Sequence, residues 1–422
     1  MKTYDLVIIG GGAGGLFAGV LASENKLKTL IIEKENKLGK KLLATGNGRC
    51  NIANINFYNH CYNSPEFVKS IFEEFANKEK LTNFALPLLT KLEEWGLSFY
   101  ADQEGRVYPV SNSSACVVSV LCNQLEKNKV EVMLESEVKN IKKQNNLFLV
   151  KVNNEIIKSK SVLLCCGGSA TKLAESFGHS VTKLTRSLVG FKTKQNFKPI
   201  SGVRVSNAVV NVQFENAVLK SSHSPLTTVT PNRFSEKGEI IFKDDGLSGI
   251  CVMNSSSIVA RNSDEKFKLS LDLLPDISFE KVKEKLEKFY QLNKEDMLNC
   301  LYGWFAKPLA QWLFNKYKTP QKIAQQIKNF EIEVCGTYEN NQVTCGGVNI
   351  SELNLTQSKL VSGLYLSGEM LNVDGVCGGY NLMFALTSAA SSVVEICAGA
   401  HKLWGTHNLK RFRTISPLPK KW

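Results

Sequence analysis

The stretch that decides the fold is YDLVIIGGGAGGLFAGVLASENKLKTLIIE, residues 4–33. Its beginning, 4–9, is a largely apolar run typical of a parallel strand that is buried on both faces. After six small residues, 16–24 repeats apolar side chains at helical spacing, and a second apolar run, 29–32, ends at Glu33. Strand, glycine-rich turn, helix, strand and acid, in this order, form the context in which G-x-G-x-x-G binds a dinucleotide. The sequence therefore predicts a Rossmann-type domain.

The glycines of this motif have separate physical reasons. Gly10 permits the tight turn, Gly12 lets a pyrophosphate approach the backbone, and Gly15 lets the helix pack on the strand. The helix N-terminus, at Ala13 and Gly14, offers N–H groups and the positive end of its dipole to the phosphates. We therefore expect this turn to hold the pyrophosphate.

Glu33 and the C-terminal third indicate which dinucleotide binds. A carboxylate that accepts hydrogen bonds from both ribose hydroxyls leaves no room for a 2′-phosphate, so this site suits FAD or NAD and disfavours NADP. Residues 363–370, GLYLSGEM, predict a returning strand that ends at Gly368 and Glu369. FAD proteins of the Rossmann type commonly close their fold with such a strand, and its acid reaches the ribityl chain. The sequence thus favours FAD.

A second glycine-rich segment follows the returning strand. Asp374 precedes Gly379, Tyr380 and Asn381, and a helix of small residues comes next, at 384–396. N–H groups at the start of that helix would stabilise the electron-rich reduced flavin if they face its ring. A turn that only lets the helix pack is the alternative interpretation.

Another buried strand, 162–166, leads into Gly167 and Gly168, as strands beneath the cofactor do in FAD folds. The chain has no second G-x-G-x-x-G and no C-x-x-C dithiol. Disulfide reductases with two dinucleotide sites carry both features, so the sequence argues against that class.

The loop after Glu33 reads GKKLLATGNGRCNIAN, residues 39–54. Gly48 lets the backbone approach a ligand, Lys40 and Arg49 supply cations, and Asn51 supplies an amide donor. We expect this loop to cover the pyrophosphate and the flavin.

This loop, together with EGRVYPVS (104–111), GEIIFKDDGLSG (238–249) and SGLYLSGEMLNVDGVCGGYNLMFA (362–385), resembles the BaiN-like flavoproteins. Members are described as NAD(P)/FAD-dependent oxidoreductases, bile-acid double-bond reductases or aminoacetone oxidase family enzymes. The resemblance runs from residue 3 to about 398. It implies a non-covalent FAD in a Rossmann domain that is interrupted by a β-rich domain and a small helical domain.

The resemblance also implies a set of FAD contacts. They are Gly12, Ala13, Gly14, Glu33, Lys34, Lys40, Gly48, Arg49, Cys50, Val138 (through its backbone, to adenine), Gly368, Glu369, Asp374, Tyr380 and Asn381. The residue patterns described above add Gly10, Gly15, Asn51, Gly167, Gly168 and Gly379.

Catalytic roles are expected near the flavin. Cys50 and Arg49 are candidates for the flavin neighbourhood, and Tyr380 or Tyr108 for a proton donor. Packing alone is the alternative for Cys50 and for the aromatic side chains. We expect an FAD oxidoreductase, with NAD(P)H as a transient electron donor to a small enone-like substrate. A peroxide-producing amine oxidase, an RNA-modifying or RNA-binding flavoprotein and a non-catalytic flavin-binding protein remain alternatives.

The domain organisation is inferred from changes in the residue pattern along the sequence. We expect the FAD-binding domain in 1–186 and 347–400. A β-rich insert occupies 187–273 and 331–346, a helical domain 274–330, and a basic tail 401–422.

Composition sets the remaining limits. With 43% hydrophobic and 22% charged residues, the chain has globular composition, which excludes a disordered or fibrous protein. No uninterrupted apolar run reaches the roughly 18 residues of a membrane helix. Asp5 argues against a signal peptide, so we expect a cytoplasmic protein with its twelve cysteines reduced and no bound metal. Six Lys/Arg of the tail account for much of the +13 net charge, and no RNA-recognition signature is present, so we expect no nucleic-acid partner.

Overall fold

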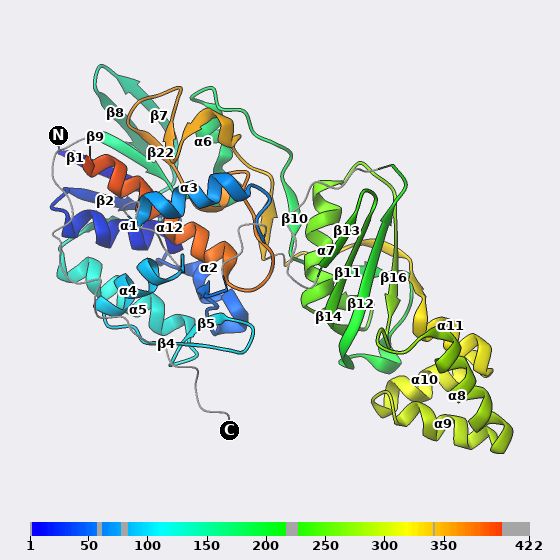
Figure 1. Ribbon diagram of the computed structural model, residues 1–422. Helices are drawn as coiled ribbons and strands as arrows, with labels where there is room; N and C mark the ends of the chain where they lie inside the picture. The colour runs from blue at the N-terminus through cyan, green and yellow to red at the C-terminus, as the bar shows by residue number, and fades with distance from the viewer. Residues whose placement is uncertain (1, 57–60, 77–82, 217–226, 341, 399–422) are drawn as a thin grey trace. The chain divides into compact units, whose positions relative to one another are not determined.

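The computed structural model describes residues 2–56, 61–76, 83–216, 227–340 and 342–398. The predicted basic tail lies outside the described residues. The chain divides into two compact units (Figure 1). Unit 1 comprises Met1–Leu184 and Gly346–Trp422, and unit 2 comprises Thr185–Cys345.

A parallel sheet forms the centre of unit 1. Its strands are β22 (Leu364–Leu366), β9 (Glu155–Leu164), β1 (Thr3–Ile9), β2 (Thr29–Ile32) and β6 (Glu131–Met133), in this spatial order. Leu6 of β1 pairs with Thr29 on one side and Ser161 on the other. Short strands β20 (Leu353–Asn354) and β21 (Gln357–Ser358) extend the β22 edge, and the hairpin of β7 (Val138–Gln144) and β8 (Leu147–Val152) extends from β9. The Rossmann-type α/β prediction is confirmed.

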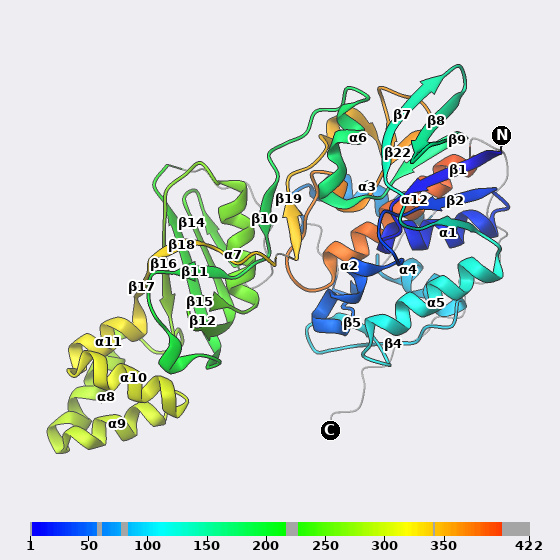
Figure 2. The ribbon, with the colours of Figure 1, turned by 180° about the vertical axis from the view of Figure 1, so that it is seen from behind.

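Small residues bring two helices close together against this sheet. Helix α1 (Ala13–Glu24) packs on α12 (Tyr380–Ala398), which also packs on α3 (Pro65–Phe75) (Figures 1 and 2). A Cβ at Gly14 would lie 2.9 Å from the carbonyl oxygen of Ala385, so the helices could not approach as closely with a larger residue. Further helices of the unit are α4 (Leu86–Glu94) and α5 (Ser114–Lys127).

Helix α12 is long and apolar enough to cross a membrane by length and composition alone. Its sequence includes polar residues, so no uninterrupted apolar run signalled it. Most of the helix is buried inside unit 1, where Met383, Leu386 and Val393 belong to the hydrophobic core. The packing is that of a core helix.

The loop after β2 contains α2 (Lys40–Leu43) and a short 3-10 turn, Thr45–Gly48. It leads into a small antiparallel sheet of β3 (Ala53–Asn54), β5 (Arg106–Pro109) and β4 (Phe99–Ala101). After β9, the chain forms the 3-10 turn Gly167–Ala170 and α6 (Thr171–Glu175).

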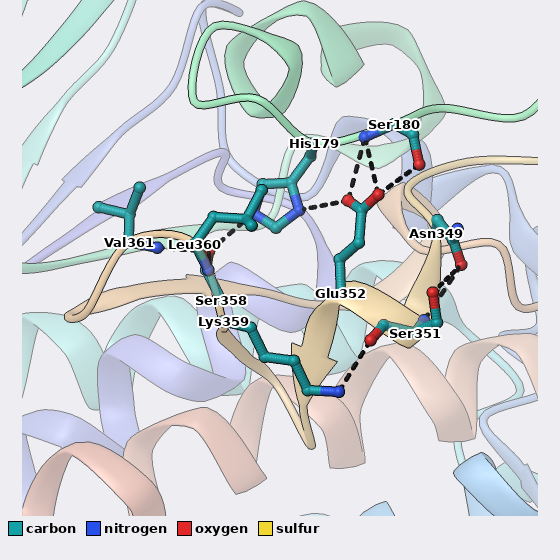
Figure 3. A network of polar contacts seen from close by, with 9 residues as sticks. All are labelled: His179, Ser180, Asn349, Ser351, Glu352, Ser358, Lys359, Leu360 and Val361. Atoms are coloured by element: carbon teal, nitrogen blue, oxygen red, sulfur yellow. Dashed lines mark hydrogen bonds and ion pairs between the residues drawn. The ribbon is translucent and has the colours of Figure 1, made fainter.

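A buried histidine joins the end of this segment to the β22 side of unit 1 (Figure 3). His179 Nδ1 lies 2.9 Å from Glu352 Oε2, and its Nε2 lies 2.8 Å from Ser358 Oγ. Ser180 donates to the same carboxylate through its backbone and its hydroxyl. Beyond this cluster, residues 181 and 348 form an antiparallel bridge.

Unit 2 is built on an antiparallel sheet with the order β17-β16-β12-β14-β15-β11-β18, and β13 pairs with β14. The strands are β11 (Phe191–Thr193), β12 (Arg204–Phe214), β13 (Thr227–Thr230), β14 (Arg233–Lys243), β15 (Gly246–Ser248), β16 (Phe267–Asp272), β17 (Phe330–Ile332) and β18 (Val334–Thr337). Separately, β10 (Thr185–Ser187) pairs with β19 (Val343–Cys345).

Five α-helices accompany this sheet in the part of unit 2 that the structure describes. They are α7 (Ile250–Arg261), α8 (Phe279–Leu292), α9 (Lys294–Tyr302), α10 (Lys307–Tyr317) and α11 (Pro320–Lys328). Leu271 of the sheet, Leu286 of α8 and Ile327 of α11 belong to one hydrophobic cluster. The boundaries expected at 273 and 331 therefore fall inside a unit whose strands and helices share a core.

Candidate active site

Four loops of unit 1 leave the same edge of the parallel sheet. They begin after the neighbouring strands β1, β2, β9 and β22, which all point the same way. In open α/β sheets, ligands bind outside the carboxyl ends of the strands. The predicted cofactor residues in these loops are therefore brought to one edge by the topology.

The glycine-rich turn is closed by the acid that follows β2. The Gly11 N–H donates to Glu33 Oε2 at 2.6 Å, and the Glu35 N–H donates to Glu33 Oε1 at 2.9 Å. A Cβ on Gly15 would lie 1.9 Å from the carbonyl oxygen of Gly10, so the turn needs glycine for its own packing there.

Gly12 differs from Gly15. A Cβ at Gly12 would meet nothing within 4 Å, and its backbone has an ordinary φ of −77°. The open space lies directly at the N-terminus of α1, where no side chain caps the helix. This arrangement fits a phosphate of a dinucleotide, because backbone N–H groups and the helix dipole face a space without a side chain.

Two lysines of the next loop form different ion pairs. Lys41 Nζ lies 2.5 Å from Glu369 Oε2 and so joins α2 to the turn after β22. Lys40, which we expect to contact FAD, forms an ion pair with Glu35 at 2.6 Å, and its side chain is exposed. Lys34 is also exposed, next to Glu33.

Arg49 lies over an aromatic side chain. Its guanidinium is 4.9 Å from the centroid of the Tyr108 ring, which stacks in turn on Tyr100 at 5.8 Å. Arg49 itself is exposed and Tyr108 is buried. The stack holds a positive charge in a defined place at the edge of the small β3-β5-β4 sheet.

Cys50, the neighbour of Arg49, is fully buried and has a left-handed backbone, with φ of 61°. Burial raises the pKa of its thiol to about 11. The thiol is therefore protonated at neutral pH, which favours a packing role over a nucleophilic one.

The second glycine-rich segment docks on the same loop. With the Asn51 amide oriented to satisfy both ends, Oδ1 accepts from the Gly379 N–H at 3.1 Å and Nδ2 donates to Ala53 O at 3.1 Å. Gly379 has a φ of 96°, and a Cβ there would lie 2.2 Å from Ala53 O. The contact between these loops thus requires glycine.

The remaining residues of this segment stabilise its backbone. The Tyr380 hydroxyl donates to Asn56 O at 2.9 Å, which gives the hydroxyl of this expected proton donor a structural partner. The Asn381 amide bonds to both backbone groups of Gly375, at 2.9 and 2.8 Å. Asp374 is buried, and its N–H donates to the side chain of Asn63 at 3.0 Å.

The other predicted residues lie in the strand-end loops. Gly167 is close to Glu369, whose Oε2 would lie 3.2 Å from a Cβ at that glycine, and Gly168 follows in the same turn. The Gly368 N–H donates to Ser388 Oγ of α12 at 2.9 Å. Val138 is the first residue of β7, and Ser136, two residues before it, donates its N–H to Glu33 O at 2.9 Å.

Sequence reasoning missed two supporting side chains. Asn63 holds Asp374, and Ser388 holds Gly368, from segments far away in the chain. The small-residue pattern of α12 was a signal for Ser388, whereas nothing in the local sequence marked Asn63. In the described part of the chain, no group of three His, Cys, Asp or Glu could hold a metal ion.

The sheet, the turn around Gly12 and the returning strand β22 are those of a Rossmann-type dinucleotide-binding protein. The chain matches the HI0933-like protein Rossmann domain over residues 4–394 and belongs to this family. This confirms the flavoprotein resemblance seen in the sequence.

Two relatives align with nearly the whole chain. The 3-dehydro-bile acid delta(4,6)-reductase of Clostridium scindens is 31% identical over 90% of this chain and 95% of its own. The ribosomal RNA dihydrouridine synthase of Escherichia coli is 26% identical over 94% of this chain and 99% of its own. The protein is an FAD-dependent oxidoreductase.

The fold is similar to that of a solved 3-ketosteroid delta1-dehydrogenase from Sterolibacterium denitrificans. That structure has a TM-score of 0.50 and 12% sequence identity, and the match covers 94% of this chain and 100% of the other.

Proposed function

We propose that the enzyme reduces a carbon–carbon double bond conjugated to a carbonyl group, with NAD(P)H as the electron donor. The observation that carries this proposal is the pair of full-length relatives. The delta(4,6) double bonds of a 3-oxo steroid and the 5,6 double bond of uracil belong to different substrates, but both systems are conjugated to a carbonyl group. Both reactions therefore reduce a carbon–carbon double bond that is conjugated to a carbonyl group.

The residues of unit 1 fit the binding of FAD. Gly12 and the start of α1 suit the pyrophosphate, and we assign the ribose to Glu33, which follows β2 and accepts from the Gly11 N–H. Glu369, which follows the returning strand and forms an ion pair with Lys41, is our candidate for the ribityl chain. Bound FAD would supply hydride transfer, which no protein side chain provides.

Arg49 and Tyr108 are the side chains we assign to the substrate. Addition of hydride to the far carbon of an enone moves negative charge onto the carbonyl oxygen, and a fixed cation stabilises that charge. Arg49 is exposed and held in place by the Tyr108 ring. Burial raises the pKa of Tyr108, so its hydroxyl carries a proton at neutral pH, as protonation of the near carbon requires. Tyr380 is the second choice, because its hydroxyl is committed to Asn56.

NAD(P)H is proposed to bind transiently, because the sequence contains a single G-x-G-x-x-G. The twelve cysteines are all free, which suits a reducing compartment such as the cytoplasm.

Anaerobic flavin reduction tests the function. The holoenzyme should bleach with NADH or NADPH and regain its colour on mixing with a 3-oxo-Δ4 steroid or a uridine-containing oligoribonucleotide. In the comparison experiment, a panel of amines replaces NAD(P)H as the reductant, and the reduced enzyme is then exposed to air. Reduction by an amine alone, with peroxide formed in air, would contradict the proposal and favour an oxidase.

A further inference from the structure

We propose that a groove on α10 of unit 2 binds a single-stranded RNA segment through its phosphates and one base. This inference rests on the proposed function, because it selects uridine in RNA as the substrate class. Its binding site is separate from the residues assigned to FAD and to hydride transfer.

The groove has a volume of about 500 Å³ and lies between the 3-10 turn Lys198–Ile200 and α10. Lys307 and Pro308 line it at the start of the helix, and Gln311, Trp312 and Lys316 line it further along. Ala306, the N-cap residue, provides no side-chain cap, and the first turn has no acidic residue. The positive end of the helix dipole and the Lys307 ammonium therefore act in the same place.

The charge of this part of the chain is one-sided. From Met297 to Phe330 the sequence has five lysines, no arginine and no acidic residue. Lys307 and Lys316 are exposed, and within the described residues neither ammonium lies in an ion pair. Lys328, by contrast, pairs with Asp272 at 2.7 Å. Two unpaired cations that line one groove therefore indicate a polyanionic ligand rather than a salt bridge to an acidic side chain of the protein.

An aromatic ring gives the groove a surface for a base. Trp312 packs on Phe197 and Phe330, with ring centroids 6.2 and 5.8 Å apart, so its indole is fixed, while it also lines the groove. Lys316 Nζ lies 4.6 Å from the Trp312 ring. A base that stacks on the indole would displace this ammonium toward the adjoining phosphate. Trp312 is half-buried. A positively charged groove that also presents an aromatic ring is the combination found in sequence-tolerant single-strand binding.

The test measures binding of a fluorescent 12-nucleotide oligouridine to the full-length FAD-loaded enzyme at several salt concentrations. We compare wild type with Lys307→Gln/Lys316→Gln and, separately, Trp312→Phe. The matched control is Lys281→Gln/Lys288→Gln on α8, which removes the same charge from exposed sites near Glu280 and Glu284. Because every variant retains the basic tail, differences report the groove.

We expect the groove double variant to lose about 10-fold in affinity and about 1.4 in the slope of log affinity against log salt. Trp312→Phe should lose a few-fold, and the control pair little, with steroid-enone reduction unchanged in all three. Equal losses in the groove and control variants, or displacement of the RNA by polyglutamate at equal charge, would overturn the proposal. Failure of enone reduction with RNA binding intact would refute the proposed function instead.

Discussion

At the scale of single residues, Gly12 and Gly15 separate cofactor binding from folding. A methyl group at Gly12 meets open space, whereas one at Gly15 would overlap the Gly10 carbonyl at 1.9 Å. We expect Gly12→Ala to fold with near-wild-type stability but to lose FAD, since the methyl fills the space of a phosphate. Gly15→Ala should lower the free energy of unfolding by several kcal/mol, as overpacking does.

Flavin absorbance after purification and urea unfolding of the apoprotein measure the two effects. Full FAD content in a stable Gly12→Ala variant would show that the pyrophosphate lies elsewhere.

Cysteine reactivity tests the role of Cys50. Its thiol is buried with a pKa of about 11, whereas Cys116 is exposed and hydrogen bonds from the hydroxyls of Ser111 and Ser113 lower its pKa. Because the thiolate is the reactive form, iodoacetamide at about pH 7.5 should label Cys116 early and Cys50 only after unfolding. Peptide mass mapping over time gives the order. Rapid labelling of Cys50 in the native enzyme would restore it as a catalytic candidate.

At the scale of elements, local sequence patterns predicted the helices and strands that residues close together in the chain determine. The strand–turn–helix–strand order of residues 4–33 and the helices of 279–330 are local features, and both are present. The His179–Glu352–Ser358 cluster could not be foreseen, because His179 lies 173 and 179 positions before its two partners and each is an ordinary polar residue by itself (Figure 3). For the same reason the sequence could propose Lys40 as a ligand but not reveal that Lys41 is the lysine that reaches Glu369.

The contact of α12 with the β20–β21 turn predicts a pH-dependent stability. Thr356 donates to Glu395 Oε1 through its N–H and its hydroxyl, at 3.2 and 2.6 Å, yet burial raises the pKa of this carboxyl from 4.5 to about 7. The folded chain therefore binds an extra proton between these values. The free energy of unfolding falls as the pH rises through this window, and the full cost of the charge is present above about pH 7.

Glu395→Gln removes this cost and retains an oxygen for Thr356. The variant should match wild type near pH 5 and exceed it by about 1 to 2 kcal/mol near pH 8, since the side chain is half-buried. Urea titrations at both pH values give the comparison, and Glu74→Gln serves as the control for a neighbouring charge. A variant that is less stable at the higher pH would show that the carboxylate is stabilising.

At the scale of the whole molecule, the cofactor residues and their core belong to unit 1. Every residue expected to contact FAD lies before residue 185 or after residue 345. Among the residues that the structure describes, none from between these positions belongs to the hydrophobic core of unit 1. Composition alone could not show that unit 1 has a core of its own, because the membership of a core depends on which side chains contact one another in the folded chain. The net charge of +13 likewise combines contributions from separate parts of the chain. These include the acid-free segment from Met297 to Phe330 in unit 2 and the basic tail.

This independence predicts that unit 1 folds and binds FAD without unit 2. The chain leaves and re-enters unit 1 through paired segments: residues 181 and 348 form a bridge, and the Thr182 N–H donates to Gly347 O at 2.9 Å. An Asn-Gly turn is suited to joining two antiparallel segments, so it can replace residues 185–345. The shortened protein should be yellow and should unfold in one transition. It should lose the oligouridine binding assigned to α10, apart from any contribution of the tail. A colourless or aggregated product, with FAD retained by the full chain under the same conditions, would show that unit 1 depends on unit 2 for its folding.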